Sequence, residues 1–385
     1  MSEVYFDNAA TTPMTKPVID ELIKQTENTW GNASTGYSYG RHSKLVLENS
    51  RHVIAQSINA KDEEIVFTSG GTESDNTAII QTALTRQNLG KHIITTAIEH
   101  EAILKPLHYL EFDVTYLPVD KNGNISLADF KAALRDDTIL VSIMMGNNEV
   151  GSRMPIHEIG EILKDHQAWF HTDAVQAYGL LPIDVEADHI DLMSTSAHKL
   201  NGPKMVGFLY RRDGISFPSF VRGGDQETKR RAGTENVPAI AAFAKAVSID
   251  TPEEKQKRQE RYYHFKQLIV KRLTDAGVDF EVNGQLDPHA LNHVLNLWFK
   301  GISTYVMQTD LDLAGYAVSG GSACTAGSIE PSHVLTAMFG KDSPRISESI
   351  RISFGALNTE EEVNGLVDAI IEIVNKLKNI KGVED

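Results

Sequence analysis

Short apolar runs alternate with helical patterns between about residues 60 and 212. The runs are rich in Ile, Val, Thr and Phe, and they are continuous rather than interrupted by a polar residue at every second position. Strands buried on both faces have this pattern, which predicts a mostly parallel sheet covered by helices. The predicted strands span residues 64–69, 92–97, 112–117, 138–145, 169–174, 192–197 and 207–212. The last strand follows its neighbour so closely that it could be antiparallel.

The pattern changes near residue 237, where helical periodicity takes over and a long helix, highly charged at first, is predicted over 252–273. A smaller α/β unit follows, with strands at 294–299 and 349–355 and helices near 304–314 and at the C-terminal end. Thr359 and Glu362 have the spacing of a capping box at the start of that last helix. We therefore predict an α/β fold with two domains, a large one over 14–255 and a small one formed by 1–13 together with 256–385.

The composition is that of an ordinary globular protein. The chain has 385 residues, enough for two or three domains with a full hydrophobic core. Hydrophobic residues make up 41% and charged residues 23%, which argues against extensive disorder. No window of 18 uncharged apolar residues is present, so we expect no transmembrane helix. The N-terminal sequence MSEVYFDNAATTP lacks the basic and apolar regions of a signal peptide.

Charge and cysteine content exclude further classes of function. The formal net charge is −15, so direct binding to a nucleic-acid backbone is not expected. Cys324 is the only cysteine, and it cannot form a disulfide within the chain. One thiol also cannot supply a multi-cysteine zinc or iron–sulfur site. A reducing compartment fits this usage, and we expect a cytoplasmic protein.

Polar or ionisable side chains lie at or just beyond the ends of five of the seven predicted strands. They are Thr72 within SGGTESDN (69–76), then Glu99 and His100, then Asn147, Asn148 and Glu149, then Asp173 and Gln176, and finally His198 and Lys199. Each of these has an ordinary structural explanation when taken alone. In open α/β sheets, however, ligands bind outside the carboxyl ends of the strands, and these ends meet at one edge. The set therefore predicts one ligand site.

The lysine in this set indicates the chemistry. Lys199 directly follows a buried run, and a desolvated lysine has a lowered pKa and can form a Schiff base. Asp173, about one βαβ unit earlier, would flank the same ligand. The small residues of 69–76 lead into a helix whose free N–H groups could hold a phosphate. A lysine, an acid, a phosphate cradle and an aromatic ring for stacking are the requirements for pyridoxal phosphate.

Across nearly the whole chain, the motifs resemble those of cysteine desulfurases of the NifS/IscS type, in the aminotransferase class V family. The motifs are YFDNAATTP (5–13), GNAS (31–34), TSGGTESDN (68–76), NNEVG (147–151), HTDAVQA (171–177), SAHKLNGPKMVGFLY (196–210), RRAGTEN (230–236), SGGSACTAG (319–327) and RISFG (351–355). The resemblance implies the fold of type I pyridoxal-phosphate enzymes, pyridoxal 5'-phosphate as cofactor and L-cysteine as substrate.

The resemblance also implies a role for each matching residue. Lys199 would be the point of covalent attachment, His100 would stack on the pyridine ring, Asp173 would pair with the ring nitrogen, and Gln176 would bond the ring hydroxyl. The phosphate would be held by Gly71, Thr72, Ser196 and His198 and, from the partner subunit of a homodimer, by Thr234. Asn148 would help to fix cofactor and substrate, Arg351 and Asn32 would bind the substrate carboxylate, and Cys324 would accept the sulfur.

Two departures from the family pattern affect the finer predictions. Ala33 and Tyr37 stand where the family often has Pro and His, so no role is carried over to Tyr37. The chain stops soon after NKLKNIKGVED, whereas many IscS-type proteins have a longer tail that docks the iron–sulfur scaffold. We therefore expect the sulfur-acceptor protein to be a tRNA-thiolating enzyme, or an iron–sulfur scaffold that docks differently.

Two other classes of function remain to be compared with desulfurization of L-cysteine to L-alanine. An aminotransferase, a selenocysteine lyase or a kynureninase-like hydrolase would share the lysine site, but would not need a cysteine in a glycine-rich, permissive loop. A catalytically idle sulfur carrier would need Cys324 but not Lys199, Asp173 and His100 together. The sequence therefore favours a sulfurtransferase that carries a persulfide on Cys324.

Overall fold

Seven strands form the large sheet, in the order β2-β8-β7-β6-β5-β3-β4. They are β2 (Ile65–Thr68), β3 (His92–Thr96), β4 (Asp113–Leu117), β5 (Thr138–Ser142), β6 (Trp169–Asp173), β7 (Leu192–Ser194) and β8 (Gly207–Arg211). Strand β8 is antiparallel to both of its neighbours, and the remaining pairs are parallel. The predicted α/β class is thereby confirmed, as is the antiparallel last strand. The computed structural model describes residues 3–320 and 331–381.

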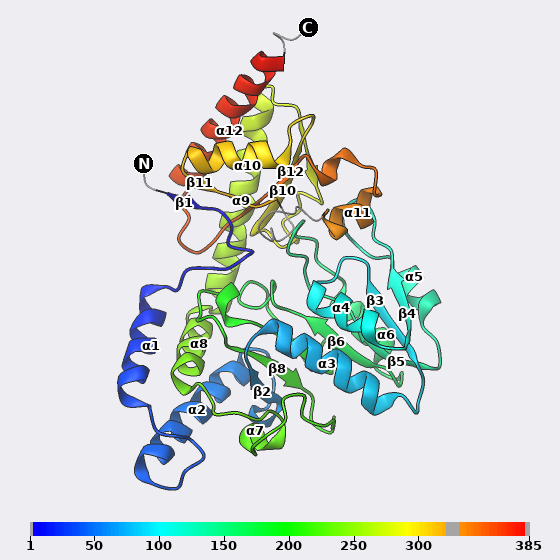
Figure 1. Cartoon of the computed structure of the whole chain (residues 1–385), viewed down its shortest axis with the longest axis vertical. Coiled ribbons are helices and arrows are strands. Elements are labelled where there is room, and N and C mark those ends of the chain that lie inside the picture. The colour runs from blue at the N-terminus through cyan, green and yellow to red at the C-terminus, as the bar shows by residue number, and fades with distance from the viewer. Residues whose placement is uncertain (1–2, 321–330, 382–385) are drawn as a thin grey trace.

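Helices pack around this sheet (Figure 1). Those of the first 250 residues are α1 (Lys16–Asn28), α2 (Ser38–Gln56), α3 (Gly71–Arg86), α4 (Glu101–Tyr109), α5 (Leu127–Ala133), α6 (Ile156–Leu163), α7 (Gln226–Lys229) and α8 (Val237–Ile249). The central strands β3, β5 and β7 are buried throughout, as their continuous apolar runs predict. Strand β4 differs, because it lies at the sheet edge and exposes Asp113 and Tyr116.

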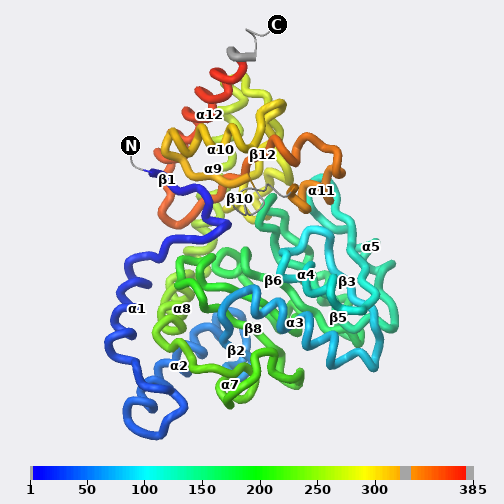
Figure 2. Tube along the Cα trace, in the orientation of Figure 1, coloured from blue at the N-terminus to red at the C-terminus, as the bar shows by residue number. Residues whose placement is uncertain are grey.

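A second hydrophobic core is formed by elements that lie in the upper part of the chain trace (Figure 2). It is built on the antiparallel sheet β12-β10-β9, formed by β9 (Phe280–Asn283), β10 (Val294–Phe299) and β12 (Ser349–Ser353). The helices of the second core are α9 (Pro252–Asp275), α10 (Thr304–Leu313) and α12 (Glu360–Lys381). Helix α11 (His333–Phe339) instead buries Val334, Leu335 and Met338 in the first core, which is the core around the large sheet. Helix α9 reaches both cores: Lys255 donates to the Leu181 carbonyl at 3.4 Å, and Phe265 is buried in the second core.

The capping box predicted for the last helix is present. The backbone N–H of Thr359 donates to Glu362 Oε2 at 3.0 Å, and the N–H of Glu362 donates to Thr359 Oγ1 at 3.2 Å. Two of the donors that a helix start leaves open are thus satisfied reciprocally. Within residues 3–320 and 331–381, the helices are too short or too polar to cross a bilayer.

The N-terminal segment joins the two cores. Strand β1 (Val4–Tyr5) pairs in parallel with β11 (Tyr316–Ala317), and Phe6 is fully buried in the second core. Further along, the Thr12 hydroxyl donates to the His198 carbonyl at 2.8 Å, at the edge of the large sheet. A single N-terminal segment therefore connects the second core to the loop that follows β7.

Replacing Phe6 tests how strongly this segment holds the fold. Its ring lies 6.5 Å from that of Tyr316 and 6.2 Å from that of Phe354. We expect Phe6→Ala to lower the free energy of unfolding by about 3–5 kcal/mol, because it leaves a cavity in the core. Phe6→Leu should cost less than about 1.5 kcal/mol, because it keeps most of the volume. Urea unfolding of both variants measures this difference, and equal stabilities would contradict it.

Candidate active site

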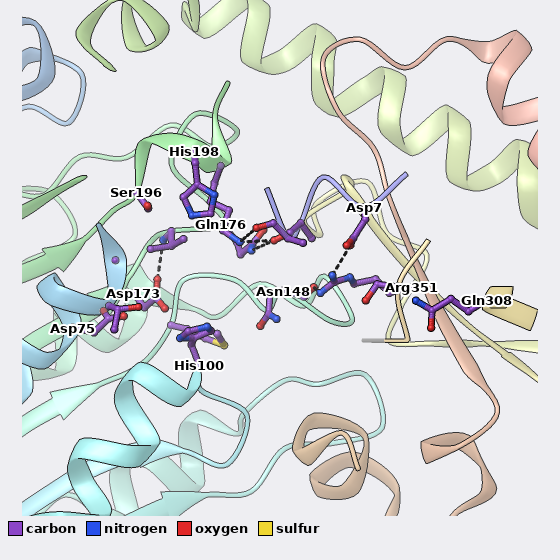
Figure 3. A pocket seen from close by; sticks show the side chains of 18 residues that line it. Asp7, Asp75, His100, Asn148, Asp173, Gln176, Ser196, His198, Gln308 and Arg351 are labelled. Atoms are coloured by element: carbon purple, nitrogen blue, oxygen red, sulfur yellow. Dashed lines mark hydrogen bonds and ion pairs between the residues drawn. The ribbon is translucent and has the colours of Figure 1, made fainter. Parts of the chain in front are cut away.

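A cavity of about 450 Å³ opens where the carboxyl ends of the large sheet face the N-terminal segment and β12 (Figure 3). Its lining includes many of the residues predicted from the sequence, namely Gly71, Thr72, His100, Asn148, Asp173, Gln176, Ser196, His198, Lys199 and Arg351. Residues that the sequence analysis did not single out also line it, among them Asp7, Asp75 and Gln308. The strand ends therefore do meet at one site.

Lys199 lies in a short helical turn, Ala197–Lys199, just beyond β7. Its Nζ donates to the carbonyls of Ala9 at 2.5 Å and Ala10 at 2.9 Å, both in the N-terminal segment. Burial and the positive charge of Arg351 together lower the pKa of Lys199 to about 8, against the opposing charges of Asp173 and Asp7. The neutral, nucleophilic form of the amine is therefore much more populated near neutral pH than that of an ordinary lysine.

Asp173 and His100 lie on the same side of the cavity. Asp173 ends β6, its Oδ1 accepts the Val175 N–H at 2.8 Å, and burial raises its pKa while the charge of His100 opposes this. His100 caps α4, and its Nδ1 accepts the Ala102 N–H at 3.1 Å. The neutral ring consequently carries its proton on Nε2. Burial lowers the pKa of His100, which favours this neutral donor form.

A second carboxyl group, Asp75 of α3, is buried beside Asp173 (Figure 3). Burial and the charge of Asp173 raise its pKa well above the ordinary value, and its Oδ1 has no hydrogen-bond partner among the described residues. His171 Nε2 lies 3.7 Å from Asp75, but burial lowers the pKa of His171 to about 3, so this ring is neutral. This end of the cavity therefore holds buried acids that a cationic ligand group would complement.

The start of α3 is suited to an anion. Gly70 adopts φ +145°, which favours glycine, and a Cβ at Gly71 would lie only 2.7 Å from Val175 Cγ2. The free N–H groups of this 16-residue helix face the cavity end that Thr72 and Ser196 also line. Burial lowers the pKa of the nearby His198 to about 4. Neutral donors and the helix dipole would therefore hold a phosphate here.

These features fit pyridoxal phosphate, the cofactor predicted from the sequence. The helix start with its two glycines would hold the phosphate, and Asp173 with the unpartnered oxygen of Asp75 would match a protonated ring nitrogen. Lys199 lines the same cavity with an amine of lowered pKa.

Arg351 faces the cavity from β12, at the end opposite to the acids (Figure 3). Its Nη2 pairs with Asp7 Oδ1 at 2.6 Å, and its Nη1 donates to the Asn148 carbonyl at 3.0 Å. The ion pair fixes the orientation of a guanidinium that could bind a carboxylate. Asp7 is a cavity residue that the sequence analysis missed. The available signal was one charged side chain in YFDNAATTP, which is otherwise uncharged.

Three of the predicted site residues do not contribute to the described cavity. Asn32 is exposed in the loop between α1 and α2, where its Oδ1 accepts the Ser34 N–H at 2.9 Å. Thr234 is exposed between α7 and α8. Cys324 lies outside the described residues. Their roles stay predictions.

Comparisons with known proteins agree with this site. The family model "Aminotransferase class-V" matches residues 4–366. A protein of Bacillus subtilis (strain 168) named "Putative cysteine desulfurase IscS 1" is 54% identical over 380 residues, covering 98% of this chain and 100% of its own length. "Cysteine desulfurase IscS" of Methanosarcina thermophila is 45% identical, covering 98% of this chain and 93% of its own length.

Solved structures of related proteins have the same fold as this chain. A structure named "NIFS-LIKE PROTEIN" has a TM-score of 0.89 and 35% sequence identity, covering 97% of this chain and 99% of its own. The structure "SspA in complex with cysteine" has a TM-score of 0.79 and 34% identity, covering 91% of this chain and 98% of its own.

The lowered pKa of Lys199 makes a direct prediction about pH. Covalent attachment of pyridoxal phosphate to the cofactor-free protein, trapped with borohydride, should speed up as the pH rises through about 8, because only the neutral amine reacts. Arg351→Gln should move this midpoint upward, because the positive charge of Arg351 lowers the pKa of Lys199. Lys199→Arg is the control that cannot attach the cofactor. An unchanged midpoint in Arg351→Gln would contradict the conclusion that the charge of Arg351 lowers the pKa of Lys199.

Proposed function

The chain belongs to the aminotransferase class V family and is a pyridoxal-phosphate-dependent cysteine desulfurase; from this premise we propose that it converts L-cysteine to L-alanine and takes up the sulfur as a persulfide on Cys324. The observation that carries the proposal is the buried Lys199 amine between the acids at one end of the cavity and Arg351 at the other. The SspA structure that holds cysteine supports L-cysteine as the substrate.

The two ends of the cavity would orient the substrate. Arg351, held by Asp7, offers a bidentate fork to the substrate carboxylate. Pyridoxal phosphate supplies an aldehyde that condenses with amines and a ring that accepts electrons, and Asp173 would keep its ring nitrogen protonated. Lys199 has the pKa of a base that could remove the proton from the substrate Cα. His100 would donate a hydrogen bond from Nε2, or return a proton to the product.

The sulfur transfer itself is assigned to Cys324. Its thiolate, the nucleophilic form, would bond to the sulfur of the substrate while the bond between that sulfur and Cβ breaks. One sulfur atom moves: Cys324 becomes a persulfide, and the carbon that loses sulfur gains a hydrogen to give L-alanine. The persulfide would then pass to an acceptor protein of iron–sulfur cluster assembly or of tRNA thiolation, in the cytoplasm.

We also propose a homodimer, in which Thr234 reaches the cofactor phosphate of the partner subunit. Its exposure, and its place outside the cavity of its own chain, support this arrangement. Asn32 is exposed as well, in a loop at the lower end of the molecule (Figure 1), so a substrate contact from Asn32 would also have to cross between subunits. The second hydrophobic core supports the proposed small domain, 1–13 with 256–385, because it combines Phe6 with residues between Tyr262 and Val374. The first core draws mainly on the proposed large domain, 14–255, although Leu291 and three residues of α11 also pack into it.

A mixed dimer tests the exchange of Thr234. One subunit carries Lys199→Ala and the other carries Thr234→Ala, each with its own affinity tag. If Thr234 serves the partner, one site collects both defects and the other is intact, so the mixed dimer should have about half of the wild-type activity. Both parent homodimers should be inactive or nearly so. Activity near zero in the mixed dimer would show that Thr234 serves its own chain.

Cys324→Ser tests the persulfide. The variant should bind pyridoxal phosphate normally, because Cys324 is assigned no contact with the cofactor. It should build no protein persulfide, detected by mass spectrometry after incubation with L-cysteine, and it should release sulfide only at a background rate. Since Cys324 is the only cysteine, no other thiol of the chain can replace it. Sulfide release at the wild-type rate would indicate a lyase that expels sulfur directly, and would overturn the proposal.

A further inference from the structure

The side chain of Gln176 forms a hydrogen bond with a buried histidine, His293, which lies next to the small sheet. Gln176 follows β6 and lines the cavity, whereas His293 directly precedes β10 of the small sheet. Gln176 Oε1 lies 2.8 Å from His293 Nε2, and Gln176 Nε2 donates to the Ala9 carbonyl at 3.0 Å. Both side chains are buried, with 8% of Gln176 and 4% of His293 exposed. The contact is therefore shielded from water and joins two parts of the chain.

The neighbouring groups determine which atoms donate. The Ala9 carbonyl can only accept, so the amide nitrogen of Gln176 has to face it, and the amide oxygen has to face His293. His293 must then donate from Nε2, which leaves Nδ1 without a proton. Nδ1 has no hydrogen-bond partner within the described residues, in agreement with a neutral ring held by one bond and by packing.

The charges around His293 keep this form neutral. Burial lowers the pKa of His293 to about 3, and the positive charges of Lys266, Arg351 and Lys199 act in the same direction. Lys266 is itself buried on α9, with its Nζ 3.4 Å from the Leu291 carbonyl. A second proton on His293 would therefore place a positive charge among other cations. The neutral ring with its proton on Nε2 consequently persists across the working pH range.

We propose that His293 is a positioning residue that holds Gln176 with its amide nitrogen, not its oxygen, available to the cavity. The amide nitrogen has two hydrogens, of which the Ala9 carbonyl takes one. The other can donate to the ring oxygen of the cofactor, an inference that rests on the proposed function. Without His293 only the Ala9 carbonyl holds the amide, so the side chain can move away from the position in which its second N–H reaches the hydroxyl oxygen of the cofactor ring.

The absorption of the bound cofactor reports this contact independently of turnover. A donor to the ring oxygen stabilises its ionised form, so loss of the donor should raise the pH of the cofactor's absorption transition. We expect Gln176→Ala and His293→Leu both to raise it, by about one pH unit, since a hydrogen bond to a charged group is lost. The double variant should shift no further than Gln176→Ala alone, because His293 acts through Gln176.

Two further variants separate positioning from general stability. His293→Gln keeps an N–H donor at a similar reach and should bring the transition back toward the wild-type pH. Asn292→Ala removes a buried neighbour that donates to the Pro288 carbonyl and not to Gln176, so it should lower the unfolding temperature without moving the transition.

Each contrary result has a distinct meaning. A wild-type protein without a cofactor band would overturn the proposed function and this inference with it. A shift in Gln176→Ala but none in His293→Leu, or fully additive shifts in the double variant, would overturn the positioning role alone. A shift in Asn292→Ala equal to that in His293→Leu would also overturn it, because the effect would then come from general loss of structure.

Discussion

The hydrogen bonds from Lys199 Nζ to the carbonyls of Ala9 and Ala10 are the contact on which the site depends. They bring an amine at the end of the large sheet against the N-terminal segment, whose β1 pairs with β11 and whose Phe6 is buried in the second core. The same Ala9 carbonyl accepts from Gln176. Because carbonyl groups only accept, this segment orients every donor that meets it, and it also removes the amine from water.

Burial then sets the charge balance of the cavity. The acids Asp75 and Asp173 have raised pKa values at one end, and Lys199 has a lowered pKa between them and Arg351. Charged groups in such a place are costly unless they are paired. A ligand with a cationic ring nitrogen and an anionic phosphate, together with a substrate carboxylate, would pair with these groups, and such ion pairs are stronger where water is excluded.

The strand pattern carried most of the fold prediction. The continuous apolar runs became β2 to β8, since burial on both faces selects such runs. Strand β4 is partly exposed at one edge of the sheet, whereas β2 at the other edge is fully buried. Burial of an edge strand therefore depends on which elements cover it, and this is not recorded in the strand itself. The short pairing of β1 with β11 could not be predicted from the sequence, because two residues are too few to show a hydrophobic periodicity.

By itself the sequence determined the residues whose position follows from chain order. Asp173 ends β6, and His100 and Lys199 lie a few residues beyond the ends of β3 and β7. Parallel strands bring such ends to one edge of the sheet. Only the tertiary structure decided what meets them from elsewhere. Asp7 pairs with Arg351 across 344 positions of sequence, and His293 meets Gln176 across 117. Hydrophobic periodicity indicates which face of a helix or strand is buried. A contact between residues far apart in the sequence depends on how the two cores pack together, and this packing cannot be predicted from a local sequence pattern.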